Sequence, residues 1–173
     1  ANSWYSNQVA TLTNAGILAG FPDGRFGPHE HITRAEFATI AALFFHAPEV
    51  EGDAFSDISD SWAREYINRA AALGLVSGLP DGTFRPEEKV TTGQALKMII
   101  LAAGYAEPET VSSHWARGYL NFALEAGILE RGEITDLDVS MSRLLTAKVS
   151  ARALGVTRQD AQQKFTDTND DCV

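Results

Sequence analysis

The feature that most constrains this fold is an internal repeat with a constant spacing of 58 residues. A single offset that holds through so many positions indicates two copies of one structural unit, which must stack to bury a shared core. The positions that recur are Trp4 and Trp62, Gly16 and Gly74, Gly20 and Gly78, Pro22 and Pro80, Asp23 and Asp81, Gly24 and Gly82, Phe26 and Phe84, Pro28 and Pro86, and Thr33 and Thr91.

A third copy of the unit is fainter. Trp115-Ala-Arg follows the pattern of Trp62-Ala-Arg, and Gly127-Ile-Leu follows that of Gly16-Ile-Leu, at an offset of 53 residues from the second copy. This copy has no Pro-Asp-Gly, and it is four residues shorter between Gly127 and Val139 than the second copy is in the matching stretch. We therefore expect three units, of which the third is degenerate.

Each unit is predicted to form a helix, a loop and a second helix. The first helix follows a serine that is suited to the N-cap or lies next to it, and it ends at a glycine suited to the C′ position with positive φ. These residues are Ser3, Ser61 and Ser113, and Gly16, Gly74 and Gly127. The Pro-Asp-Gly that comes next in the first two units is typical of a tight turn, since proline presets φ and glycine tolerates the left-handed region.

The second helix of the first two units is predicted to begin with a capping box. Thr33 is followed three residues later by Glu36, and Thr91 by Gln94, which is the spacing this reciprocal cap requires. The third unit keeps the apolar stripe of this helix without a capping box at the matching place. The apolar residues in the first two units are Phe37, Ile40, Ala41 and Phe44, and Leu96, Ile99, Ile100 and Ala103.

Composition and motifs exclude several classes of protein. The net charge of −9 argues against a nucleic-acid partner, and no run approaches the ~20 apolar residues of a membrane helix, so we expect no membrane insertion. Cys172 is the only cysteine, which excludes an internal disulfide. Asp23 and Asp81 are interpreted as turn residues, because the alternating ligands of a calcium loop are missing. We expect no metal, no cofactor and no enzymatic activity.

The stretch GILAGFPDGRFGPHEHITRAEFA resembles the S-layer homology repeat, and FSDISDSWAREYI resembles the opening of such a repeat. The resemblance implies an all-α fold of three helix-loop-helix repeats, arranged as a pseudo-threefold spindle around a central helix bundle with grooves between neighbours. The expected boundaries are 1–49 for the first repeat, whose opening is missing, 50–106 for the second and 107–164 for the degenerate third. Residues 165–173 resemble the start of a further repeat.

The resemblance also implies a function and a site. Such modules anchor proteins to the bacterial cell surface by binding secondary cell-wall polysaccharides, often through pyruvate ketals, so the expected location is extracellular, in the cell wall or S-layer. The arginine that contacts the acidic group in the family corresponds to Arg34, at a helix start where amide groups also favour anions. The groove wall is expected to come from the next repeat, which gives the predicted ligand-binding residues Arg34, Thr33, Asp57, Ser59, Ser61 and Trp62.

The arginine position is predicted to be Thr92 in the second repeat and Met141 in the third, so one groove is expected to be competent, or two. Lys89, Arg85 and Arg143 are candidates to substitute for the lost arginines. The alternative function is a protein–protein assembly module that forms a surface fibre or lattice by head-to-tail contact between copies of the chain.

Overall fold

The computed structural model describes residues 9–10, 12–13, 18–21, 23–109 and 113–155. Five helices have both ends within these residues, and no strand occurs among them, so the all-α prediction is confirmed. The helices are α2 (Arg34–Phe44), α3 (Arg64–Ala72), α4 (Thr92–Ala102), α5 (Arg117–Glu125) and α6 (Arg143–Ala153). None of the described helices has the length and apolar character needed to cross a membrane.

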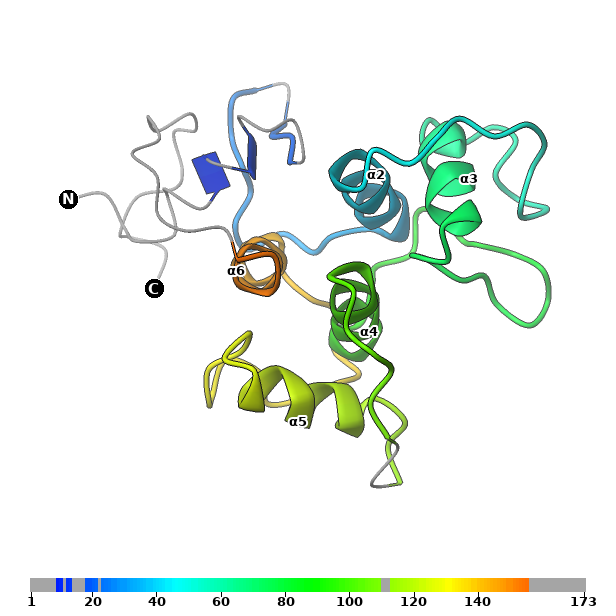
Figure 1. Ribbon diagram of the computed structural model, residues 1–173. Coiled ribbons are helices and arrows are strands. Elements are labelled where there is room, and N and C mark those ends of the chain that lie inside the picture. Colours follow the sequence, from blue (N-terminus) through cyan, green and yellow to red (C-terminus); the bar gives the residue numbers. More distant parts are fainter. Residues whose placement is uncertain (1–8, 11, 14–17, 22, 110–112, 156–173) are drawn as a thin grey trace.

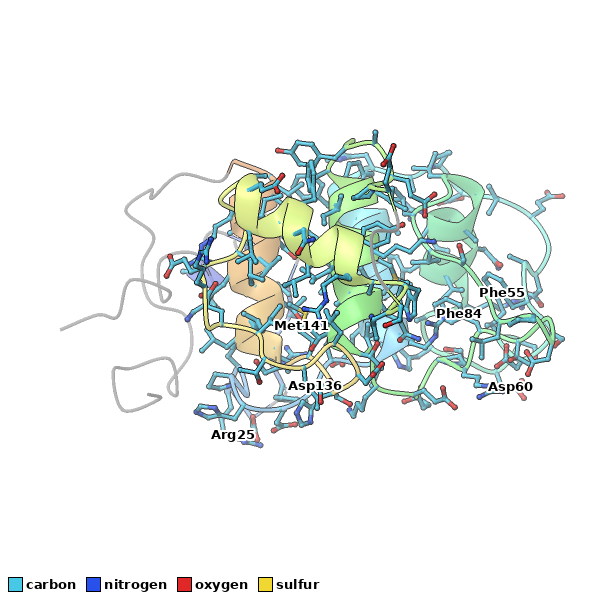
Figure 2. The ribbon with its side chains drawn as sticks, turned by 90° about the horizontal axis from the view of Figure 1, so that it is seen from below. Arg25, Phe55, Asp60, Phe84, Asp136 and Met141 are labelled. Atoms are coloured by element: carbon cyan, nitrogen blue, oxygen red, sulfur yellow. The ribbon has the colours of Figure 1, made fainter. Side chains whose placement is uncertain are left out.

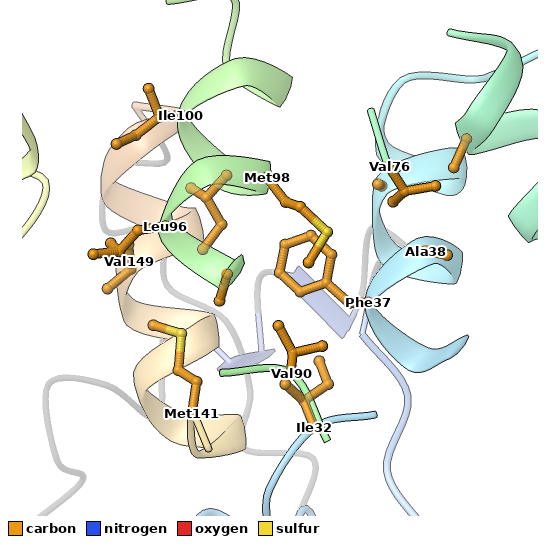
Figure 3. Close-up of a cluster of buried hydrophobic side chains, with 14 of the residues drawn as sticks. Ile32, Phe37, Ala38, Val76, Val90, Leu96, Met98, Ile100, Met141 and Val149 are labelled. Atoms are coloured by element: carbon orange, nitrogen blue, oxygen red, sulfur yellow. The ribbon is translucent and has the colours of Figure 1, made fainter. Parts of the chain in front are cut away.

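The second helices of the three predicted repeats, α2, α4 and α6, are grouped at the centre of the molecule (Figure 1). The first helices lie outside this group: α3 packs against α2, and α5 packs against α4. Side chains from all three central helices, among them Phe37, Leu96 and Val149, fill the space between them (Figure 3). This grouping agrees with the expected central bundle, while the pseudo-threefold spindle and the repeat boundaries stay predictions.

Both predicted capping boxes are confirmed. Thr33 accepts from the amide of Glu36 while the Glu36 carboxylate accepts from the amide of Thr33, and Thr91 and Gln94 make the same reciprocal pair. In the third repeat, Ser142 caps α6 by accepting from the amide of Leu145 at 3.2 Å. Because leucine cannot return the bond, the box is absent there, as expected.

The cap of α6 corrects the predicted register of the third repeat. Arg143 follows Ser142 directly, as Arg34 follows Thr33, so the arginine position is Arg143 and not Met141. Met141 is a buried core residue, 1 % exposed. The third repeat therefore keeps its arginine, whereas Thr92 is confirmed at that position in the second repeat.

The first helices begin later than the serines indicate. The N-cap of α3 is Ala63, whose amide donates to Ser61 Oγ at 3.3 Å, and the N-cap of α5 is Ala116, whose amide donates to His114. The polar side chain thus supports a turn before the helix and does not cap it. Gly74 and Gly127 have the positive φ predicted for a C′ glycine. Ser3 and Gly16 lie outside the described residues.

A closed ring of three backbone hydrogen bonds joins the repeats where the central helices begin. Ile32 donates to Met141 at 3.2 Å, Met141 donates to Val90 at 2.9 Å, and Val90 donates to Ile32 at 3.0 Å. Each residue directly precedes the N-cap of α2, α4 or α6. All three side chains are buried, at the same end of the bundle (Figure 3). The ring ties the starts of the three helices to one another.

Candidate functional site

Two grooves of similar size open on the surface, and each combines a central helix with a loop, a tryptophan and an arginine. The Arg34 groove has a volume of about 200 Å³ and is lined by Arg34, the loop after α3, one face of α4, and Trp115. The Arg143 groove has a volume of about 240 Å³ and is lined by Arg143, residues 18–21, one face of α2, and Trp62.

The two grooves are the same site in successive repeats. The α4 residues that line the first are Gln94, Lys97, Met98 and Leu101, and the α2 residues that line the second are Glu36, Thr39, Ile40 and Leu43, each 58 positions earlier. In both cases the arginine comes from the start of a different central helix. Arg34 of α2 enters the groove of α4, and Arg143 of α6 enters the groove of α2.

Arg34 is buried in its groove, 6 % exposed, and held by main-chain carbonyls. Nε donates to Phe84 O at 2.6 Å, Nη2 donates to Ser77 O at 2.9 Å, and the guanidinium lies 4.5 Å from the centroid of the Phe84 ring. Phe84 in turn stacks on Phe55, with the ring centroids 5.1 Å apart (Figure 2). Arg34 forms no ion pair with any described carboxylate.

Burial lowers the pKa of the Arg34 guanidinium, because desolvation disfavours its charged form. The negative charges of Glu88 and Asp57 act in the opposite direction from outside ion-pair distance. Arginine stays protonated at any physiological pH, so Arg34 remains a cation. The lowered pKa means that nearby negative charges do not fully offset the cost of burying its positive charge. A carboxylate in the groove would compensate it.

A second cation and an exposed aromatic ring complete the Arg34 groove. Lys97 Nζ lies 3.3 Å from the Glu107 carboxylate, which Tyr119 also contacts through its hydroxyl, and this hydrogen bond lowers the pKa of Glu107. Trp115 is 44 % exposed and packs its ring edge-on against Tyr119. Cationic groups beside an open aromatic face suit a ligand that is both acidic and ring-shaped.

Arg143 makes the same contacts in the other groove, with one addition. Nε donates to Phe26 O at 2.9 Å and Nη2 donates to Ala19 O at 2.6 Å, at the positions equivalent to Phe84 and Ser77. In addition, Nη1 donates to Glu36 Oε1 at 2.8 Å. The cation of the Arg143 groove is therefore paired with a carboxylate of the protein.

The first amides of α2 already have partners within the protein, so the role of this N-terminus in anion binding stays a prediction. The amide of Arg34 donates to Glu88 O and that of Ala35 donates to Pro86 O, both at 2.9 Å, and the amide of Glu36 donates to Thr33 Oγ1. The α4 and α6 helices place their first two amides on carbonyls of a neighbouring repeat in the same way. An anion would have to displace one of these bonds to reach an amide.

The other predicted site residues do not line the Arg34 groove. Asp57 accepts from the amides of Phe84 and Arg85 at 2.7 and 2.8 Å, so it shapes the loop, and Ser59 is exposed and lines neither groove. Ser61 supports the turn before α3. Trp62 lines the Arg143 groove and not the Arg34 groove. Arg34 packs on the loop after α3, in the next repeat, whereas Trp62 lies in the groove beside α2 itself.

Sequence reasoning missed Gln94, Lys97 and Trp115 as groove residues. The signal that could have found them is the spacing of residues 94, 97, 98 and 101, which places them on one face of a helix and recurs at 36, 39, 40 and 43. The same face of the third repeat carries Lys148 and Arg152, and both pair with Glu133, at 3.9 and 2.6 Å.

The turn interpretation of the Pro-Asp-Gly loops is confirmed by the contacts of their aspartates. Asp81 Oδ1 accepts from the amide and hydroxyl of Thr83, and Asp23 accepts from the amide and side chain of Arg25. The described residues contain no cluster of three His, Cys, Asp or Glu side chains that could hold a metal ion. Cys172 and the predicted start of a further repeat at 165–173 lie outside them.

Comparison with known proteins identifies related sequences. The family model described as the S-layer homology domain matches residues 1–38 and 54–96. Cell surface glycoprotein 1 of Acetivibrio thermocellus is 31% identical over 135 residues, which cover 66% of this chain and 6% of that protein. The cellulosome-anchoring protein of the same organism is 33% identical over 103 residues, 56% of this chain and 23% of that protein.

A surface layer protein of Brevibacillus choshinensis is 35% identical over 129 residues, which cover 69% of this chain and 11% of that protein. The chain thus spans less than a quarter of the length of each of these relatives.

Proposed function

Because the chain belongs to the S-layer homology domain family, we propose that it is a non-catalytic module that anchors a protein to the bacterial cell wall by binding an anionic wall polysaccharide. The chain is a cell-surface, cell-wall-associated segment, as its surface-layer and cell-surface relatives are. One relative is named for anchoring the cellulosome, which supports an anchoring role here.

The observation that best supports the proposal is that the buried charge of Arg34 has no ion-pair partner among the described residues. A buried charge is unfavourable unless it is paired, and among the described residues the hydrogen-bond partners of the Arg34 guanidinium are two carbonyls, in a groove that is open to solvent. The guanidinium fork can bind both oxygens of one carboxylate, so a ligand carboxylate would supply the missing partner. Lys97 adds a second positive charge on the same side.

The size of the groove restricts what it would hold. A volume of about 200 Å³ is below the range of pockets that enclose a drug-sized ligand. It would therefore take one acidic sugar residue, with the rest of the polysaccharide running over the surface. A pyruvate ketal is a suitable acidic group because it presents a compact carboxylate next to an apolar methyl group, which could face Met98 and Leu101.

Calorimetric titration with purified wall polysaccharide, native and depyruvylated, tests the proposal. We expect binding to the native form alone. Lys97→Thr, which installs the residue of the other groove, should weaken binding about tenfold, or about 1.4 kcal/mol. Trp115→Ala should weaken it as well, and both side chains are exposed enough for the fold to tolerate the change.

Arg131→Thr is the matched control, since it removes one exposed positive charge outside both grooves. If Arg131→Thr weakens binding as much as Lys97→Thr does, the binding follows net charge and the groove assignment fails. Equal affinity for native and depyruvylated polysaccharide would remove the ketal from the proposal. The assembly alternative depends on residues 1–8 and 165–173, outside the described residues, and sedimentation at rising concentration tests it.

A further inference from the structure

We propose that the third residue of each central helix decides whether the groove beside it accepts an anion. Glu36 closes the Arg143 groove to anions, and Gln94, at the equivalent position, leaves the Arg34 groove open to them. The inference rests on the proposed function. It assigns the anionic sugar of the polysaccharide to the Arg34 groove, and it names the helix position that makes the two grooves differ in anion binding.

Glu36 and Gln94 perform the same structural task. Glu36 Oε2 accepts from the amide of Thr33 at 2.7 Å, and Gln94 Oε1 accepts from the amide of Thr91 at 3.1 Å, so each completes a capping box. Glutamine and glutamate are both suited to this position. Capping therefore needs one oxygen, and it does not need the negative charge.

The second terminal atom of the two side chains differs. Glu36 Oε1 is a charged acceptor and binds Arg143 Nη1 at 2.8 Å. The corresponding atom of Gln94 is an amide nitrogen, which can only donate and so cannot bind the guanidinium of Arg34. The two arginines are otherwise held alike, by a carbonyl on Nε and a carbonyl on Nη2.

The charges that line the grooves follow from this difference. Among the described residues, Arg143 and Glu36 are the charged ones that line one groove, and their charges cancel. The charged residues among those described that line the Arg34 groove are Arg34 and Lys97, and both are positive. Lys97 also forms an ion pair with Glu107, which does not line the groove. The side chains of Arg143 and Glu36 are only 6 % and 26 % exposed, so solvent screens the pair little. A ligand carboxylate would have to displace Glu36 and would be repelled by its charge.

Reciprocal substitution tests the inference. Glu36→Gln gives the Arg143 groove the residue of the Arg34 groove, and Gln94→Glu does the reverse, while both keep a capping-box residue. The probe is the cyclic pyruvate ketal of methyl glucoside, with methyl glucoside as the uncharged control. The readout is the pair of indole N–H signals of Trp62 and Trp115 in nitrogen-15 correlation spectra, because each tryptophan lines one groove. The same spectra show whether each variant is folded.

In the parent we expect the ketal to shift the Trp115 signal and to leave that of Trp62 unchanged. In Glu36→Gln the Trp62 signal should also shift, and in Gln94→Glu the Trp115 shift should need at least about tenfold more ketal. A Trp62 signal that already shifts in the parent, or that stays unchanged in Glu36→Gln, would overturn the inference. A Trp115 signal that does not shift in the parent would instead overturn the proposed function, and the Trp62 signal of Glu36→Gln would still decide the inference.

Discussion

The carboxylate of Glu36 lies 2.8 Å from Nη1 of Arg143, although the two residues are 107 positions apart in the chain. The contact joins the first turn of α2 to the first turn of α6. Arg143 also reaches the carbonyls of Phe26 and Ala19, so one side chain holds together the first and third repeats. A buried arginine in this position has both a structural role and an effect on the groove it lines.

Arg143→Ala should be among the most destabilising single substitutions in the protein. It removes the hydrogen bonds to Phe26, Ala19 and Glu36 and leaves the Glu36 carboxylate without this cation. The expected loss is about 3–5 kcal/mol in the free energy of unfolding. Urea denaturation followed by circular dichroism measures it. Arg34→Ala should be less damaging, because Arg34 forms no ion pair with a described carboxylate.

The double variant Glu36→Gln with Arg143→Ala provides the control for that prediction. If the charge left on Glu36 is part of the damage, the double variant should be more stable than Arg143→Ala alone. Equal stability of the single and double variants would show that the charge left on Glu36 is not part of the damage.

The capping boxes could be predicted because they are local. The threonine, the Glu or Gln three residues later and the apolar stripe fix the starts of α2 and α4 without knowledge of the rest of the fold. The start of α6 was misplaced because Val139 was matched to Val90, an offset of 49 residues. From α4 to α6 the offset is 51, so Arg143 takes the place expected for Met141.

The composition of the grooves could not be predicted in the same way. A repeat offset shows which positions are equivalent, and it does not show on which neighbour each position packs. The loop carbonyls that hold Arg34 belong to Ser77 and Phe84, 43 and 50 residues away. The sequence therefore indicated Arg34 and Trp62 as site residues, and it did not show that they line different grooves.

The second Pro-Asp-Gly turn should contribute to acid sensitivity. The hydroxyl and amide of Thr83 and the guanidinium of Arg85 lower the pKa of Asp81 from 3.8 to about 2. Because the folded state has the lower pKa, the stabilisation is complete above the unfolded pKa and is lost as the pH falls from about 4 towards 2. The thermal midpoint of the parent should fall across this range, and that of Asp81→Asn should fall less. Parallel curves for the two proteins would show that this carboxylate does not contribute.

Gly93→Ala should destabilise the protein although it lies in a helix. Alanine is normally favoured over glycine in a helix by about 1 kcal/mol. Here a Cβ on Gly93 would lie 2.8 Å from the Cβ of Ala116 and 3.3 Å from the carbonyl oxygen of Leu137. The expected net loss is about 1–2 kcal/mol, from the shift that α5 must make. A gain in stability on urea denaturation would show that α4 and α5 can separate without loss.

The hydrogen-bonded ring of Ile32, Val90 and Met141 predicts that the described repeats unfold together. Open repeat arrays contact only their neighbours, and their cooperativity can break down, whereas this ring joins each repeat to both of the others. Ile32→Ala removes a fully buried side chain at the ring and should lower stability by about 2–5 kcal/mol. Tryptophan fluorescence and far-ultraviolet circular dichroism should report the same urea midpoint in the parent, and a lower but still common midpoint in the variant. If the two midpoints separate in the parent, the repeats unfold individually and the ring does not couple them.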